Sequence, residues 1–388
     1  MAVVRTLQAN ITADISQFQR SMQRAQAAMQ SVSDRMTNVG EQLSIGVTAP
    51  LMGVGTAAIS MAKDFSAGIA KMQAGMNITK DEALELGEVA KKVWKEGIGE
   101  DIKDISNQII TVTQNMGKLN QQDLADVVKG ADTLSKVFGL ELNEVTRSAG
   151  VMMKNFGITS SNAMDVITVG MQRGGDYSED LLDTLREYSP HFNKMGLSAE
   201  NAMNVLLAGA EGGAFMIDKV GDAIKEITIR SRDMSTGTAE AFKNLGFDAE
   251  TMFKNFGAGG DQAKSALTKV ITALTNIQDP LKQNALGVQL FGTQFEDLEI
   301  DVIKAMTSGI NAVGEFEGAT KEAGKVINET FGMEMKKMWR EVVAELRPFG
   351  IELMKLAKQI LPPLKNEVRF LINTYNKLND AQKINILK

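Results

Sequence analysis

Residues 45–65 read IGVTAPLMGVGTAAISMAKDF, and no charged side chain occurs between Glu41 and Lys63. The length is close to the roughly 20 residues that a membrane-spanning helix needs. The glycines and Pro50 make this run a poor continuous helix in water, although membrane helices tolerate both residue types better. Two interpretations remain open: a buried helix-hairpin, or a segment that inserts into a membrane after a trigger. The candidate membrane residues are Val47, Pro50, Leu51, Gly53, Val54, Gly55 and Ile59.

A heptad seam precedes this run. Its apolar residues alternate in steps of three and four over four heptads, as in a coiled coil: Ile15, Phe18, Met22, Ala25, Met29, Val32, Met36, Val39 and Leu43. So narrow a stripe needs a partner helix, either in another molecule or on the chain's own folded part. Before the seam, the alternation from Val3 to Ile11 predicts one short strand, and Asp14 then predicts a helix start.

A glycine turn recurs after the apolar run. A glycine ends one helix, an apolar residue follows, and a capping residue starts the next helix. Thr79 with Glu82 predicts a capping box that begins this region. The turns are Phe138-Gly139-Leu140-Glu141, Phe156-Gly157-Ile158-Thr159, Met195-Gly196-Leu197-Ser198 and Leu245-Gly246-Phe247-Asp248. Their spacing is uneven, so we expect short helices with tight turns, not a repeat of fixed period.

The C-terminal part has a different pattern. Pro348 and Pro362-Pro363 interrupt long amphipathic runs, which predicts two or three longer helices with kinks at the prolines. The expected apolar stripe is Trp339, Val342, Val343, Leu346, Phe349, Leu353, Leu356 and Ile360. The predicted fold class is therefore all-α. Its predicted parts are a strand plus heptad helix (1–44), an apolar segment (45–66), a compact helical core (67–329) and C-terminal amphipathic helices (330–388).

The composition narrows the possible chemistry. The chain has no cysteine, one histidine and a formal net charge of −6, which excludes thiolate chemistry and a multi-histidine metal cluster and gives no electrostatic basis for wrapping nucleic acid. Asp180, Asp183 and Glu187 lie at helical spacing near His191, a pattern more typical of a solvated helix face than of a catalytic site. The glycine-rich joints lack the lysine and spacing of a phosphate-binding loop. We expect no enzyme activity, no cofactor and no metal.

Several of these segments, in this order, resemble phage tail tape measure proteins. The most specific part is TAPL at Thr48–Leu51, followed by a glycine-alanine run and AKDF at Ala62–Phe65. The core stretch from Gly174 to Ala214 is similar, with its GLS-x-E-x-A turn, and so is the helical tail that begins ILPPLKNEV. The resemblance covers nearly all of the chain, although no single motif has the specificity of a metal-binding signature.

The resemblance implies a structural protein that fills the lumen of the tail tube, sets tail length and leaves ahead of the DNA at infection. It also implies a channel in the host membrane, and partners that include the tail tube protein, assembly chaperones and tail-tip proteins. With the seam, it favours a trimer or hexamer, made in the host cytoplasm. One alternative is a helical interaction scaffold or secreted effector unrelated to phage. An enzyme module in a longer chain is another alternative.

A ruler made of one helix rises about 1.5 Å per residue, or roughly 580 Å for this chain. The glycine turns instead fold residues 79–332 back on themselves. This region is therefore expected to be either a compact module with the ruler elsewhere, or a stored form that extends inside the tube.

Overall fold

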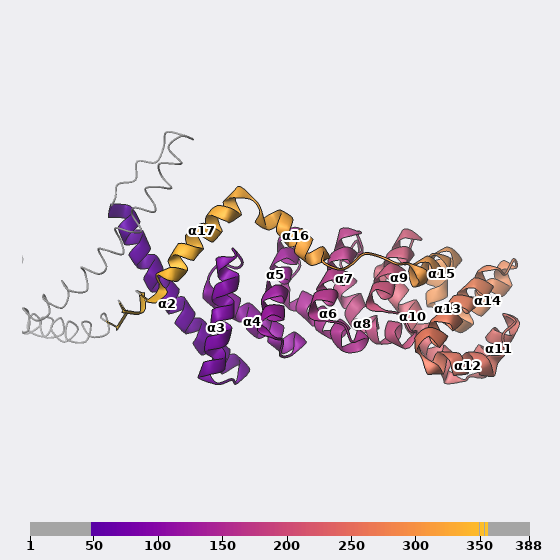
Figure 1. The fold of residues 1–388 in the computed structure, drawn as a ribbon. Helices are drawn as coiled ribbons and strands as arrows, with labels where there is room; N and C mark the ends of the chain where they lie inside the picture. Colours follow the sequence, from indigo (N-terminus) through magenta and orange to yellow (C-terminus); the bar gives the residue numbers. More distant parts are fainter. Residues whose placement is uncertain (1–47, 349, 353, 356–388) are drawn as a thin grey trace, which may run out of the picture. The chain divides into compact units, whose positions relative to one another are not determined.

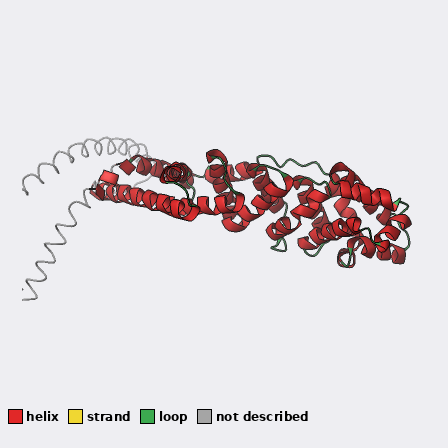
Figure 2. Cartoon of the chain, turned by 90° about the horizontal axis from the view of Figure 1, so that it is seen from below, coloured by secondary structure: helices red, strands yellow, loops and turns green. Residues whose placement is uncertain are grey.

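The computed structural model describes residues 48–348, 350–352 and 354–355 (Figure 1). Within these residues every regular element is an α-helix, and no strand occurs (Figure 2), which confirms the all-α prediction. The predicted strand at 3–11 lies outside the described residues. The helices are α2 (Thr48–Met76), α3 (Lys80–Lys95), α4 (Ile102–Met116), α5 (Gln121–Phe138), α6 (Leu142–Phe156), α7 (Ser160–Gln172), α8 (Leu181–Lys194), α9 (Ala199–Glu211), α10 (Ile217–Asp233), α11 (Thr236–Asn244), α12 (Ala249–Ala258), α13 (Gly260–Thr275), α14 (Pro280–Phe291), α15 (Gln294–Asn311), α16 (Ala319–Asn328) and α17 (Phe331–Glu345).

These residues divide into two compact units. The larger unit is 64–342, and the described part of the smaller unit is 48–63 with residues from 343 to 355. In the smaller unit, Gly350 lies against helix α2, where a Cβ atom on Gly350 would fall 2.1 Å from the Ala58 carbonyl oxygen. The two boundaries between the units fall inside helices α2 and α17. The domain limits expected from sequence stay a prediction.

Helix starts and stops in the larger unit follow the local sequence. Thr79 and Glu82 form the predicted capping box: the Thr79 N–H donates to Glu82 Oε2 at 2.9 Å, and the Glu82 N–H donates to Thr79 Oγ1 at 3.2 Å. All four predicted turn glycines have positive φ, between 69° and 86°. Thr159, Ser198 and Asp248 then cap the helices that follow, whereas Glu141 makes no side-chain cap hydrogen bond. The predicted glycine is therefore confirmed at all four turns, and the predicted capping residue at three.

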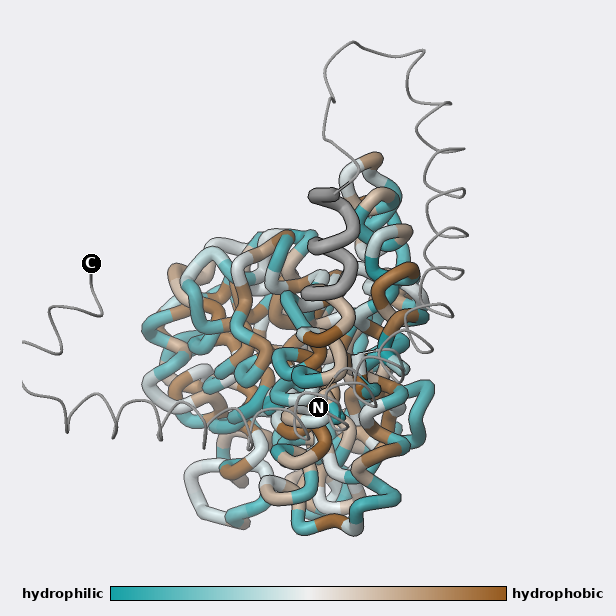
Figure 3. Tube along the Cα trace, turned by 90° about the vertical axis from the view of Figure 1, so that its left-hand side faces the viewer, coloured by the Kyte–Doolittle hydropathy of each residue, from teal (hydrophilic) through white to brown (hydrophobic). Residues whose placement is uncertain are grey.

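The helices of the larger unit pack in two rows. Helices α3, α5, α7 and α9 each contact the next member of one row, and α4, α6, α8 and α10 do the same in the other. Helices α11 to α15 close the end beyond α9 and α10. Hydrophobic and hydrophilic residues alternate along the helices (Figure 3), and the apolar ones form the core. Phe192 of α8 is fully buried, and so are Phe242, Phe256 and Phe291 in α11, α12 and α14.

After α15 the chain returns along the first row. Residues 312–318 leave α15, which packs on α9, and α16 then lies on α5 and α7 (Figure 1). Helix α17 continues to the end of α3, where Arg340 binds. We call residues 312–342 the return segment.

The expectation that the apolar run would make a poor continuous helix was wrong for its described residues, 48–65. Residues from Thr48 onward form one continuous helix through Gly53 and Gly55. Pro50 falls in the first turn, where backbone N–H groups have no intrahelical partner, so the proline costs little.

The apolar stripe predicted in the C-terminal part is only partly buried. Trp339 is 45% exposed and Val342 40% exposed, whereas Arg340 is 5% exposed and Val343 4% exposed. The Arg340 guanidinium points inward from helix α17 and donates to backbone carbonyl groups at and just beyond the end of α3.

Candidate functional site

The residues around the single histidine do not form a catalytic cluster. Asp183 pairs with Arg186, and Glu187 accepts from Lys225 Nζ at 3.1 Å. His191 is half-buried, and burial together with the charge of Lys194 lowers its pKa. These contacts describe a charged helix surface, as the sequence pattern indicated.

A second acidic group surrounds the start of α8. Asp176 Oδ1 accepts from the Leu181 N–H at 3.0 Å. Burial raises the pKa of Asp176 and of Asp218, and the carboxylate of Asp180 adds to both shifts. Among the described residues, no group of three or more histidine or acidic side chains is arranged to hold a metal ion.

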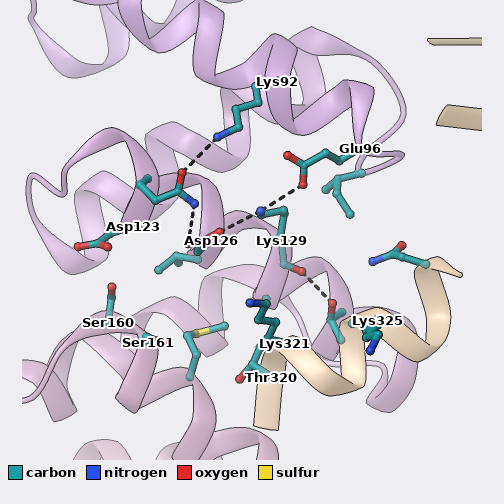
Figure 4. Close-up of a pocket in the computed structure, with 18 of the residues that line it drawn as sticks. Lys92, Glu96, Asp123, Asp126, Lys129, Ser160, Ser161, Thr320, Lys321 and Lys325 are labelled. Atoms are coloured by element: carbon teal, nitrogen blue, oxygen red, sulfur yellow. Dashed lines mark hydrogen bonds and ion pairs between the residues drawn. The ribbon is translucent and has the colours of Figure 1, made fainter. Parts of the chain in front are cut away.

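A cleft of about 1150 Å³ lies between α3, α5, α7 and the return segment (Figure 4). Its lining carries as many lysines as carboxylates. The lysines are Lys91, Lys92, Lys95, Lys129, Lys321, Lys325 and Lys337, and the acids are Glu88, Glu96, Asp123, Asp126, Asp165, Glu317 and Glu341. A surface with balanced charge offers no strong attraction to phosphate or to a cation.

The Lys129 side chain lies in this cleft between two acidic side chains. Its Nζ lies 3.1 Å from Glu96 and 2.9 Å from Asp126. Burial opposes its charge, but the hydrogen bonds and charges of the two acids prevail and raise its pKa. The Lys129 ammonium thus pairs with one acid of its own helix, α5, and with one just beyond the end of α3, an arrangement of ion pairs and not of a reacting group.

Asp165 fixes one end of the return segment. It lies on α7 with only 2% exposure. Its carboxylate accepts from the Gly318 N–H at 2.8 Å and from the Thr320 N–H at 2.9 Å. The hydroxyls of Thr168 and Thr320 also bond at 2.8 Å. Asp165 therefore caps the first turn of α16 from another helix, where the helix dipole favours a negative charge.

Arg340 fixes the other end. Its Nη1 donates to the Trp94 and Ile98 carbonyls at 2.9 and 2.7 Å, and its Nη2 to the Gly99 and Glu100 carbonyls at 2.7 and 3.1 Å. The guanidinium also lies 4.8 Å from the centroid of the Trp94 ring, which is cation–π distance. One side chain thus donates to four carbonyl groups at and just beyond the end of α3. Two of them also accept from other donors: the Trp94 carbonyl from the Gly97 N–H and the Glu100 carbonyl from the Trp94 indole N–H.

The buried positive charge at this end carries a cost. Burial lowers the pKa of Arg340, against the pull of Asp132, Asp101 and Asp104. Burial also lowers the pKa of Lys336, and the charge of Arg340 adds to that shift. Arg340 nevertheless stays protonated at neutral pH, because guanidinium does not deprotonate in proteins.

Most of the residues singled out from sequence lie outside the described part of the chain. All nine seam residues, Ile15 to Leu43, lie outside the described part, as does Val47. The other candidate membrane residues lie along α2, where Ile59 is 39% exposed. In the described part of the chain, no helix is both long and apolar enough to cross a bilayer.

Sequence reasoning missed Asp165 and Arg340. Asp165 could have been singled out from the sequence, because it is the only charged residue between Lys154 and Arg173. Arg340 could not have been singled out in this way, because it stands among other charged residues of an amphipathic helix.

Comparison with known proteins identifies relatives. Residues 96–292 match the family described as phage-related minor tail protein. The chain is 37% identical over 208 residues to a probable tape measure protein of Streptomyces phage phiC31, a match that covers 53% of this chain and 28% of that protein. It is 29% identical over 348 residues to the uncharacterized protein YqbO of Bacillus subtilis (strain 168), covering 81% of this chain and 22% of that protein. The chain thus spans about a quarter of the length of these relatives. No solved structure matches it.

Proposed function

Because the chain belongs to the phage-related minor tail protein family, we propose that it acts as a tape measure protein, which occupies the tail tube and sets tail length during assembly. The observation that carries this proposal is the 37% identity to the probable tape measure protein of phage phiC31. A structural role in the phage tail follows from the family itself. The tail tube protein, assembly chaperones and tail-tip proteins are the proposed partners.

The helical content supports a length-setting role in physical terms. A helix adds about 1.5 Å per residue, so a helical protein inside a tube converts residue number into distance. Residues 64–342 are folded back on themselves in the structure, and this region would contribute its full length only after the helices separate. Deletion within this region therefore distinguishes a measured segment from a compact module.

We expect a phage that lacks residues 181–258 of this protein, helices α8 to α12, to assemble tails shorter by about 120 Å. The measurement is tail length by electron microscopy on purified virions. The matched control replaces the same residues with an unrelated helical sequence of equal length, which should restore the original tail length. Intact tails of unchanged length after the deletion would contradict a ruler function for this region.

The proposed role continues at infection, when the protein leaves the tube ahead of the DNA and contributes to a channel in the host membrane. The observation that favours a membrane step is the run without charged residues between Glu41 and Lys63. Its small residues suit close helix packing in lipid.

A further inference from the structure

Residues 317–342 of the return segment are attached to the helical array by polar contacts instead of an apolar core. Between residues 317 and 342, the buried residues are Thr320, Gly324 and Arg340, and none is a large apolar side chain. Helix α9 in the array, by contrast, buries Met203, Val205, Leu206 and Leu207. Little hydrophobic free energy therefore holds residues 317–342 in place.

Several apolar side chains of this segment face outward, whereas Ile327, Met333 and Met335 are half-buried. Val326 is 75% exposed, Phe331 71% and Met338 51%. Lifting the segment off the array would leave these side chains as exposed as they already are. The space beneath it is the charged cleft of about 1150 Å³, so water already reaches much of the surface that opening would expose.

We propose that residues 317–342 form a detachable strap, which opens as a unit from α3, α5 and α7 while the two rows of helices stay folded. Asp165 and Arg340 are its two latches. Opening exposes the polar groups of the cleft together with a few buried apolar residues that line it, Ile98, Val127 and Met164. This apolar surface is smaller than the one that unfolding the array would expose, so the free-energy cost of opening is smaller. Phe316, which is 5% exposed, anchors the chain just before the strap. The strap is a property of this chain's fold, and its test does not depend on the role in the tail.

Hydrogen exchange on the full-length protein, followed by mass spectrometry, tests the strap. In the wild type we expect amides of 319–342 to exchange at least about tenfold faster than those of α5 and α7. Arg340→Met keeps the apolar stem but removes the donors to four carbonyls. It should speed exchange in 319–342 by a further tenfold or so, with less than about a twofold change in α5 to α10.

Lys336→Met is the matched control. It removes one positive charge from the same helix, one turn away, at a half-buried lysine. It should leave exchange in 319–342 no faster than in the wild type. If both substitutions speed exchange in 319–342 by the same factor, loss of charge and not loss of the latch loosens the segment. That result would overturn the role of Arg340.

A disulfide provides the converse test, because the chain has no cysteine of its own. A Cβ atom on Gly324 of α16 would lie 2.9 Å from Thr133 Oγ1 of α5. We expect oxidised Gly324→Cys/Thr133→Cys to slow exchange in α16 to the level of α5, and reduction to restore the fast rate. The strap is overturned if 319–342 already exchanges as slowly as α5 and α7 in the wild type, or if Arg340→Met accelerates all helices equally.

Discussion

At the residue scale, Gly196 has two separate reasons to be glycine. Its φ of +73° is in the left-handed region, and a Cβ atom there would lie 1.9 Å from the Gly260 carbonyl oxygen. The first costs a non-glycine residue about 1–2 kcal/mol, and the second forces backbone to move. We expect Gly196→Ala to lower the free energy of unfolding by about 3 kcal/mol, measured by urea denaturation.

Gly139→Ala is the control for this substitution. Gly139 has a similar φ of +75°, but no heavy atom lies within 4 Å of its added Cβ atom. It should lose only the conformational part, about 1 kcal/mol. If the two variants lose the same stability, the approach of Gly196 to Gly260 does not constrain the fold.

The sequence predicted the local conformation of these residues but not their tertiary contacts. The position of Gly196 after a helix and before Ser198 was enough to predict a turn, because αL capping depends on neighbours in sequence. Its closeness to Gly260 was not predictable, since it depends on how α8 and α13 pack. The same holds for Arg340, whose acceptors are more than 200 residues away in sequence.

At the element scale, periodicity fixed which residues of α17 share a face but not which face is buried. The stripe containing Trp339 and Val342 is present as predicted, yet both residues are exposed. Hydrophobic spacing assumes that an apolar face seeks the core. Here the hydrogen bonds from Arg340 to four carbonyl groups at and beyond the end of α3 favour the observed orientation, and these acceptors are not visible in the α17 sequence.

The apolar run allows a prediction about an isolated element. A peptide of residues 45–65 should release dye from liposomes, because 17 residues from Ile45 to Met61 contain no charged side chain. Gly53→Asp places a charge within the apolar run, at a cost of roughly 2.5–3.5 kcal/mol near a bilayer centre, and should strongly reduce leakage. Leakage by the Gly53→Asp peptide equal to that of the parent would contradict the proposed membrane step.

At the scale of the whole molecule, the two-row array is more regular than its sequence. Each helix contacts the one two positions along, from α3 to α9 and from α4 to α10. The uneven spacing of the glycine turns predicted short helices but no repeating arrangement. Turn chemistry is local, whereas the rows arise because helices of different length bury comparable apolar faces against their neighbours.

The heptad seam leads to a prediction about assembly. We expect the full-length protein to form a trimer or a hexamer in solution, because nine apolar residues in strict three–four spacing form too narrow a stripe to be buried without a partner helix. Light scattering gives the mass, and small-angle X-ray scattering tests for a rod at one end. Met22→Glu with Met29→Glu charges the seam and should yield a monomer.

The matched control for assembly is Gln23→Glu with Gln30→Glu, which adds the same charge one position away, off the seam. It should keep the oligomer. If the wild-type protein is already a compact monomer, the stripe packs on the chain's own folded part, which was the alternative left open by the sequence. Assembly of several copies would then have to be supplied by the tail or its chaperones, because a seam already buried within one chain offers no surface to a second.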